Sequence, residues 1–184
     1  GKLKRRDFLR GAAAAIAAPT FIPARVLGRN GAIPPSEQIT VGALGLGFAW
    51  EMGAHNPNTR MLAVCDVQRD RRDNAKNVVD KQYGKQDCKA YNDFREVIAR
   101  DDIDAVYIAS PDHWHALMTL AAARAGKDIY CQKPLTHTVA EGQAVVEAVR
   151  RHGVVLQHGT RHRSEWAFNS ARELIAGGHI GKLH

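Results

Sequence analysis

A lysine placed directly before a proline is the residue of this sequence that is best positioned to do chemistry. Lys133 follows the short apolar segment 128–131 and precedes Pro134. Proline fixes its own φ angle and restricts the residue before it, so we expect an extended backbone at Lys133 rather than a loose loop. A cation at the carboxyl end of a strand points into the crevice where open α/β sheets bind ligands. The alternative is an ordinary surface lysine on a loop.

Two glycines follow the first apolar segment. Gly45 and Gly47 lie between segment 39–44 and a helix that we expect near 48–54. In dinucleotide-binding proteins this is where backbone N–H groups and the helix dipole meet the pyrophosphate. The expected cofactor contacts in this loop are Gly45, Leu46, Gly47, Phe48 and Ala49.

The third glycine of the G-x-G-x-x-G pattern is absent. Trp50 stands in its place, and that glycine normally lets the first helix pack closely on the strand. The orientation of the helix is therefore in question, although Gly53 could partly compensate. Taken alone, the two glycines are as consistent with an ordinary strand–helix turn as with a cofactor site.

Asp66 favours the cofactor interpretation. It ends the second apolar segment, 61–66, at about the 20-residue offset where a carboxylate hydrogen-bonds the ribose hydroxyls of adenosine. Its alternative role is to cap the helix that we expect over 69–83. A carboxylate repels a 2′-phosphate, so NAD is the expected cofactor. Nearby arginines leave NADP open: Arg69, Arg71 and Arg72.

Two histidines follow the fourth apolar segment, 104–109. His113 and His115 are two residues apart and could chelate a metal, but catalytic zinc needs three protein ligands and no third set stands nearby. We therefore expect no metal site. Ser110 and Pro111 should lie under the nicotinamide, and His115 should face the pocket from the first turn of the next helix. His113 and the neighbouring Trp114 are expected to pack or to face solvent.

The elements that would position these residues alternate between strands and helices, which predicts an α/β fold with a doubly wound parallel sheet and right-handed crossovers. A length of 184 residues suits one domain, or one domain with the start of another. The expected strands are 39–44, 61–66, 90–91, 104–109, 128–131 and 154–157. The expected helices are 48–54, 69–83, 93–99, 113–125, 139–151 and 166–176.

The first 37 residues differ in composition from the rest. The charged stretch Lys4-Arg5-Arg6 precedes the apolar run 11–18, which is too short for a membrane span and is typical of a signal peptide. The arginine pair followed by Phe8-Leu9 resembles a twin-arginine export signal. We expect export to the periplasm or outside the cell; the alternative is a cytoplasmic protein with a basic amphipathic helix. Much of the net charge of +7 lies in these 37 residues. The sequence shows no cluster of basic and aromatic residues of the kind that binds nucleic acid, so we expect no nucleic-acid partner.

The ordered set of motifs resembles the N-terminal half of the Gfo/Idh/MocA family (glucose–fructose oxidoreductase, inositol dehydrogenase and rhizopine catabolism proteins), over about residues 38–184. The resemblance implies a Rossmann domain over 38–160 after a leader, 1–37. It also implies that 161–184 begins a second α+β domain, missing or truncated here, that often mediates homo-oligomers. The motifs are Gly45-Leu46-Gly47, Cys65-Asp66, Asp104-Ala105-Val106, Pro111-Asp112-His113-Trp114-His115 and Cys131-Gln132-Lys133-Pro134.

The resemblance also implies an activity, the NAD(P)-dependent oxidation or reduction of a sugar or cyclitol hydroxyl or carbonyl. Lys133 matches the lysine of the family's Glu-Lys-Pro motif, which would hydrogen-bond the reacting oxygen and assist proton transfer. Gln132 departs from the usual glutamate and carries no charge. In the family a His or Asp of the second domain usually completes proton transfer, so this fragment alone should be inactive. The alternatives are an NAD-dependent glycosidase and a cofactor-binding remnant without catalysis.

The expected site thus comprises two candidate catalytic residues and a larger set of cofactor contacts. The catalytic residues are Lys133 and His115. Arg161, His162 and Arg163 could approach sugar hydroxyls or form a solvated loop. Beyond the glycine loop and Asp66, the expected cofactor contacts are Ser110, Pro111, His115, Gln132 and Lys133.

Overall fold

The computed structural model describes residues 33–47 and 50–182, so the expected signal segment and the predicted contacts Phe48 and Ala49 lie outside the described residues. The chain divides into two units, Gly1–Gln38 and Ile39–His184. The described part of the first unit contains a short 3-10 helix, η3 (Pro35–Glu37). The second unit carries the sheet and every candidate site residue that the structure describes.

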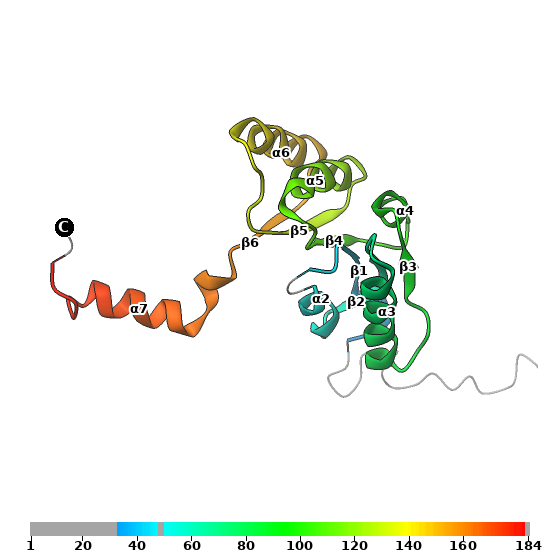
Figure 1. The fold of residues 1–184 in the computed structure, drawn as a ribbon, viewed down its shortest axis with the longest axis horizontal. Helices are drawn as coiled ribbons and strands as arrows, with labels where there is room; N and C mark the ends of the chain where they lie inside the picture. Colours follow the sequence, from blue (N-terminus) through cyan, green and yellow to red (C-terminus); the bar gives the residue numbers. More distant parts are fainter. Residues whose placement is uncertain (1–32, 48–49, 183–184) are drawn as a thin grey trace, which may run out of the picture. The chain divides into compact units, whose positions relative to one another are not determined.

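Six parallel strands form a single sheet in the second unit (Figure 1). Their order is β3-β2-β1-β4-β5-β6, which is the strand order of Rossmann dinucleotide-binding domains. The expected α/β fold with a doubly wound parallel sheet is therefore confirmed. The strands are β1 (Ile39–Leu44), β2 (Thr59–Cys65), β3 (Lys89–Tyr91), β4 (Ala105–Ile108), β5 (Asp128–Gln132) and β6 (Leu156–Gly159).

Helices cover both faces of this sheet (Figure 1). One face packs against α2 (Glu51–His55) and α3 (Arg69–Tyr83). The other packs against α4 (Phe94–Ile98), α5 (His115–Arg124) and α6 (Val139–His152). The remaining elements are two 3-10 helices, η4 (Asp112–Trp114) and η5 (Arg161–Ser164), and the helix α7 (Trp166–Ala176).

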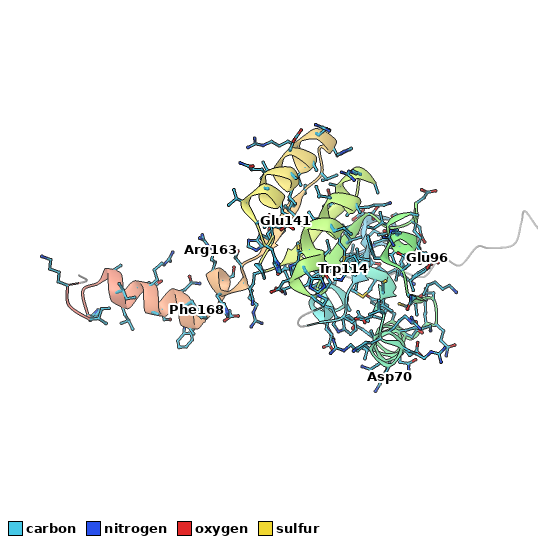
Figure 2. The ribbon with its side chains drawn as sticks, turned by 45° about the horizontal axis from the view of Figure 1, so that its top comes forward. Asp70, Glu96, Trp114, Glu141, Arg163 and Phe168 are labelled. Atoms are coloured by element: carbon cyan, nitrogen blue, oxygen red, sulfur yellow. The ribbon has the colours of Figure 1, made fainter. Side chains whose placement is uncertain are left out.

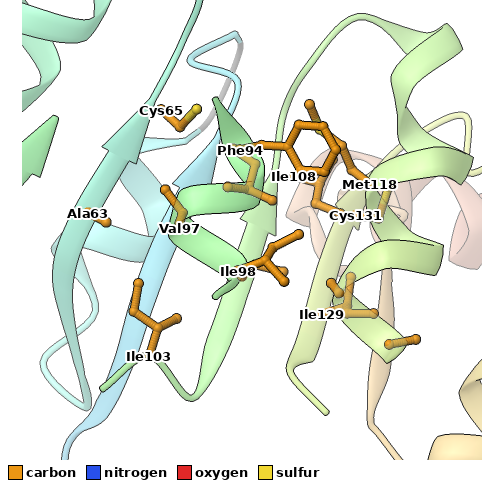
Figure 3. Packing of buried hydrophobic residues seen from close by; sticks show 14 residues of the cluster. Ala63, Cys65, Phe94, Val97, Ile98, Ile103, Ile108, Met118, Ile129 and Cys131 are labelled. Atoms are coloured by element: carbon orange, nitrogen blue, oxygen red, sulfur yellow. The ribbon is translucent and has the colours of Figure 1, made fainter. Parts of the chain in front are cut away.

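The core consists of two apolar clusters, one on each face of the sheet. Successive strand residues point to opposite faces, so Leu44 and Ile108 belong to the cluster shown in Figure 3, whereas Ala43 and Tyr107 belong to the other. The central strands are thus buried on both sides, as their nearly continuous apolar sequences require. This rigid centre fixes the strand ends that carry the candidate site.

Most element boundaries lie within two residues of the expected ones. α3 and α7 have the predicted bounds. The last strand was expected at 154–157, but β6 starts at Leu156 because the Asp128 carboxylate accepts a hydrogen bond from the N–H of Val155 at 2.8 Å. The helix expected over 113–125 is also wrong at its start: it opens as η4, and α5 begins at His115.

The cysteines form no disulfide, and all three are buried. Burial raises the pKa of the Cys65 and Cys88 thiols to about 12, and that of Cys131 to about 11. These thiols therefore stay protonated at neutral pH and act as small apolar side chains. Within the described ranges, no helix is both long and apolar enough to cross a membrane.

Candidate functional site

The predicted site residues meet at the carboxyl edge of the sheet. A cleft of about 910 Å³ opens there, which is within the usual range for small-molecule sites. Its walls come from the loops after β1, β2, β4, β5 and β6. The predicted residues that line it are Leu46, Gly47, Asp66, Ser110, Pro111, His115, Gln132 and Lys133.

A second cleft, of about 310 Å³, adjoins the first. It is lined by Gly45, the one predicted cofactor contact among the described residues that does not line the first cleft. The two clefts share Asp66, Ser110 and Pro111. A ligand that contacts these three residues can therefore extend into both clefts. A dinucleotide has this form, with a ring system at each end and a charged centre.

The second cleft also contains residues that the sequence did not single out as ligand contacts. Val67 is 79% exposed, and Trp114 is 38% exposed at the N-terminal end of α5 (Figure 2). Trp114 meets Phe94 edge-on, with ring centroids 6.3 Å apart. The sequence shows only a valine directly after Asp66 and a tryptophan beside His115; their exposure in a concave surface, which favours ligand binding, is known from the fold.

The glycine loop is shaped by its contact with the end of β4. Gly45 has a φ of +75°, and a Cβ on it would lie 2.4 Å from the Cα of Ser110. A Cβ on Gly47 would lie 2.5 Å from the carbonyl oxygen of Ala109, which accepts the Gly47 N–H at 3.1 Å. The Gly45 N–H donates to the carbonyl of Cys65 at 2.8 Å. Both glycines are therefore required by packing inside the protein, a reason that sequence spacing did not reveal.

The helix after this loop packs on the sheet through a different glycine from the usual one. Trp50, in the third glycine position, is buried in the cluster that contains Val41 and Met61. A Cβ on Gly53 would lie 3.3 Å from the Cε of Met61. Gly53 thus provides the close helix–sheet contact that the missing third glycine would have provided.

Asp66 joins the ends of β1 and β2. Its Oδ2 accepts the N–H of Leu46 at 2.9 Å, and its Oδ1 accepts the N–H of Gln68 at 2.8 Å. Gln68 itself is the N-cap residue of α3, so the carboxylate supports the start of that helix and also lines both clefts. Each carboxylate oxygen keeps a further lone pair for a ligand hydroxyl.

The three arginines near Asp66 have different surroundings. Arg71 lines the larger cleft. Arg72 instead donates to the side chain of Asn92 at 3.1 Å and to the carbonyl of Asp66 at 3.4 Å. Arg69 belongs to the first turn of α3 and lines neither cleft. Of the three, Arg71 is the one placed to meet a 2′-phosphate.

Lys133 follows the last residue of β5 and lines the larger cleft. It is exposed, and its bond to Pro134 is cis. Within 33–47 and 50–182, no carboxylate lies close enough to form an ion pair with it. Its ammonium group therefore keeps its donors for a ligand in the cleft.

Gln132 is held beneath the cleft by two tyrosines. It is 8% exposed, and its Nε2 donates to the hydroxyl of Tyr107 at 3.2 Å. Tyr107 stacks on Tyr130, with ring centroids 4.5 Å apart. Burial, together with the neighbouring Tyr130, raises the pKa of Tyr107 above its ordinary value. The amide is thus a fixed, uncharged group beside Lys133.

His115 is buried between two backbone carbonyls. Its Nδ1 lies 2.5 Å from the carbonyl oxygen of Pro134, and its Nε2 lies 2.9 Å from that of Ser110. His115 was predicted to be catalytic, and any exchange of a proton with a substrate would require the ring to leave one of these partners. His113 is exposed. No group of three or more His, Cys, Asp or Glu side chains in the described part of the chain could hold a metal ion.

Basic residues of η5 form the far rim of the larger cleft. Arg161, His162 and Arg163 all line it, as does the preceding Thr160. Glu165 pairs with Arg161 at 3.5 Å and with His162 at 3.0 Å. The rim therefore combines two arginines and a histidine with one carboxylate, which contacts Arg161 and His162.

Known proteins resemble this chain in sequence and in fold. Among curated sequences, the chain is 31% identical over 153 residues to the uncharacterized oxidoreductase YrbE of Bacillus subtilis, covering 81% of this chain and 43% of that protein. It is 30% identical over 148 residues to the myo-inositol 2-dehydrogenase of Thermotoga maritima, covering 78% of this chain and 42% of that protein. The crystal structure of a probable dehydrogenase from Thermotoga maritima superimposes on this chain with a TM-score of 0.65 at 30% identity. The superposition covers 79% of this chain and 43% of that one.

This chain spans less than half the length of these relatives. Residues 39–160 match the family described as GFO_IDH_MocA, an oxidoreductase family with an NAD-binding Rossmann fold. The match covers the six strands and the loops after β1, β2, β4 and β5 that line the clefts, and it ends just before η5. The chain therefore belongs to the Gfo/Idh/MocA oxidoreductase family and contains its NAD-binding Rossmann domain.

Proposed function

We propose that this chain is the nucleotide-binding half of an NAD(P)-dependent oxidoreductase that acts on a sugar or cyclitol hydroxyl or carbonyl. The observation that carries the proposal is the pair of adjoining clefts that share Asp66, Ser110 and Pro111 at the carboxyl ends of the strands. The substrate class is supported by the relative named as a myo-inositol 2-dehydrogenase.

We propose that the full-length protein forms homo-oligomers, as the family resemblance implies. Light scattering that gives the mass of a monomer would contradict this.

The residues present fit a dinucleotide. Asp66 would accept hydrogen bonds from the ribose hydroxyls of the adenosine, and the apolar walls at Val67 and Trp114 suit its base. The Oγ of Ser110 is buried at the shared wall and has no hydrogen-bond partner among the described residues, so the described chain leaves its hydrogen-bonding capacity unused. When bound, the cofactor supplies or accepts a hydride at its nicotinamide ring.

The chain's own contribution to the reaction is to hold the substrate oxygen and to exchange a proton with it. Lys133 lines the cleft without an ion-pair partner in the described part of the chain. Its Nζ would hydrogen-bond the reacting oxygen and take or give its proton. Gln132 keeps the neighbouring backbone in place through Tyr107. The basic rim at Arg161 and Arg163 would orient the remaining hydroxyls.

Cofactor choice tests the role of Asp66. Replacing Asp66 with alanine should weaken NAD binding about 10- to 100-fold, the effect of losing one or two charge-assisted hydrogen bonds. NADP affinity should fall less, because repulsion of the 2′-phosphate is also removed. Calorimetric titration with both nucleotides measures the two changes.

The matched control is Asp70→Ala, which removes an exposed carboxylate of α3 that lines neither cleft. It should leave both affinities unchanged. Equal loss of NAD and NADP affinity in Asp66→Ala would show that Asp66 only supports the loop. The absence of saturable binding of either nucleotide to the unaltered chain would refute the proposed function.

One observation favours a second function, cofactor binding without turnover. The uncharged Gln132 occupies the position of the family's glutamate beside Lys133. A glutamate would add a negative charge near the lysine and the cofactor, and that influence is absent here. NAD binding by the full-length protein without turnover of any sugar or cyclitol would select this function. Release of free reducing sugars without net formation of NADH would instead select a glycosidase.

We also propose that the protein is exported through the twin-arginine route, on the sequence of residues 1–37 alone. Fusing these residues to a reporter that is active only outside the cytoplasm should give a signal. Replacing Arg5 and Arg6 with lysines should abolish it, because the route reads the arginine pair. A signal that survives this change, or that persists without the twin-arginine translocase, would contradict the proposal.

A further inference from the structure

The most buried charged or ionisable side chain at the candidate site is a histidine that links two loops. His115, the first residue of α5, is 1% exposed. Its two ring nitrogens contact the carbonyl oxygens of Ser110, in the loop after β4, and of Pro134, in the loop after β5. Both loops line the larger cleft. A single imidazole therefore connects the two strand ends that carry Ser110 and Lys133.

The chemistry of the ring limits what it can do in this position. A neutral imidazole has one N–H, so it donates to only one of two carbonyl oxygens. The contact of Nδ1 with Pro134, 2.5 Å, is shorter than that of Nε2 with Ser110, 2.9 Å, which favours Nδ1 as the donor. Both nitrogens then face carbonyl acceptors, and a substrate proton has no direct route to either.

The contact with Pro134 acts on the residue before it. Lys133 lies between Gln132, which is fixed by Tyr107 and by strand pairing with Gly159, and Pro134, whose carbonyl is held by His115. Removing the ring would leave a carbonyl at the base of the cleft without its partner, and an unpaired buried acceptor is destabilising. The segment that carries Lys133 would then shift toward another donor.

We propose that His115 is a positioning residue, whose Nδ1–H holds the carbonyl of Pro134 and thereby fixes Lys133 against the substrate oxygen. This inference rests on the proposed oxidoreductase function. It gives His115 a positioning role in place of the predicted catalytic one, since the ring acts through Lys133 and not on the substrate.

Two amide variants separate the contacts of the two ring nitrogens. The side-chain nitrogen of asparagine lies at about the position of Nδ1, and that of glutamine at about the position of Nε2. His115→Asn can therefore still donate to Pro134, whereas His115→Gln can donate only to Ser110. In the full-length protein, the glutamine variant should lose about 100-fold in kcat, the effect of a misplacement of about 1 Å. The asparagine variant should lose much less and keep the wild-type pH profile of kcat.

Other results would overturn the proposal. Equal loss of kcat in both variants, with one limb of the pH profile missing in His115→Asn, would identify His115 as an acid or base. Wild-type kcat in both variants would show that the link to Pro134 does not matter. Thermal unfolding and NAD titration of each variant show whether it folds and binds cofactor, so a folding defect is not mistaken for lost positioning.

A spectroscopic measurement tests the inference without turnover. Long-range ¹H–¹⁵N correlation spectra report which nitrogen of a histidine carries the proton, and we expect Nδ1–H for His115 in the unaltered chain. The Nε2–H tautomer would contradict the proposal. A protein that shows the Nδ1–H tautomer and binds NAD but oxidises no sugar or cyclitol would refute the proposed function and leave the link to Pro134 in place.

Discussion

Replacing Lys133 with alanine in the full-length protein should reduce turnover by about 100- to 10,000-fold, the usual contribution of a positioned acid or base. NAD affinity should change little, because the cofactor's main contacts lie at Asp66 and in the loops after β1 and β4. Lys133 is exposed in the cleft, so its removal should not destabilise the fold. Steady-state kinetics and calorimetric titration measure the two effects separately.

Two further variants make this result specific. Lys133→Met keeps most of the side-chain volume and removes the charge, so it should be as inactive as the alanine variant. Lys81→Ala removes a lysine in the last turn of α3, outside both clefts, and should behave as the wild type. Turnover of Lys133→Met within a few-fold of the wild type would show that another group transfers the proton.

Replacing Gly45 with alanine should destabilise the chain by about 2–5 kcal/mol, because strain from a positive φ adds to overpacking. Gly45 has a φ of +75°, and the new Cβ would lie 2.4 Å from the Cα of Ser110. The colliding atom belongs to the backbone, so a side-chain rotation cannot relieve the contact. NAD binding should fall as well, because Ser110 is part of the wall shared by the two clefts.

Gly84→Ala is the matched control for backbone strain. Gly84 ends α3 with a φ of +62°, and a Cβ there would meet nothing within 4 Å. This variant should therefore lose only the left-handed strain, about 1–2 kcal/mol, and keep its NAD affinity. Urea unfolding gives both free energies. If the two variants are equally destabilised, the close packing of Gly45 on Ser110 is not what requires a glycine there.

The parts of the fold that depend on local patterns could be predicted from the sequence. The bounds of α3 and α7 follow from helical spacing, and the alternation of elements leads to a doubly wound sheet. The start of β6 could not be predicted, because it depends on the carboxylate of Asp128, which is 27 residues away. A side chain that takes the place of a backbone hydrogen-bond partner in the sheet leaves no periodic pattern in the sequence.

The site shows the same division between local and long-range information. Motif spacing was enough to predict that the described contacts line the two clefts. It did not reveal that Gly45 is required by Ser110, that Gln132 bonds Tyr107, or that both nitrogens of His115 face carbonyls. Each of these contacts joins separate loops or strands, and only the folded sheet brings them together.

Calorimetric titration of the chain with NAD shows whether the two clefts form a dinucleotide site. We expect saturable binding of one NAD per chain, because the two clefts share one wall and together would hold one dinucleotide. Asp66→Ala should weaken that binding and Asp70→Ala should not. No saturable heat with NAD or NADP, from a chain whose cooperative unfolding shows that it is folded, would mean that the clefts bind no dinucleotide.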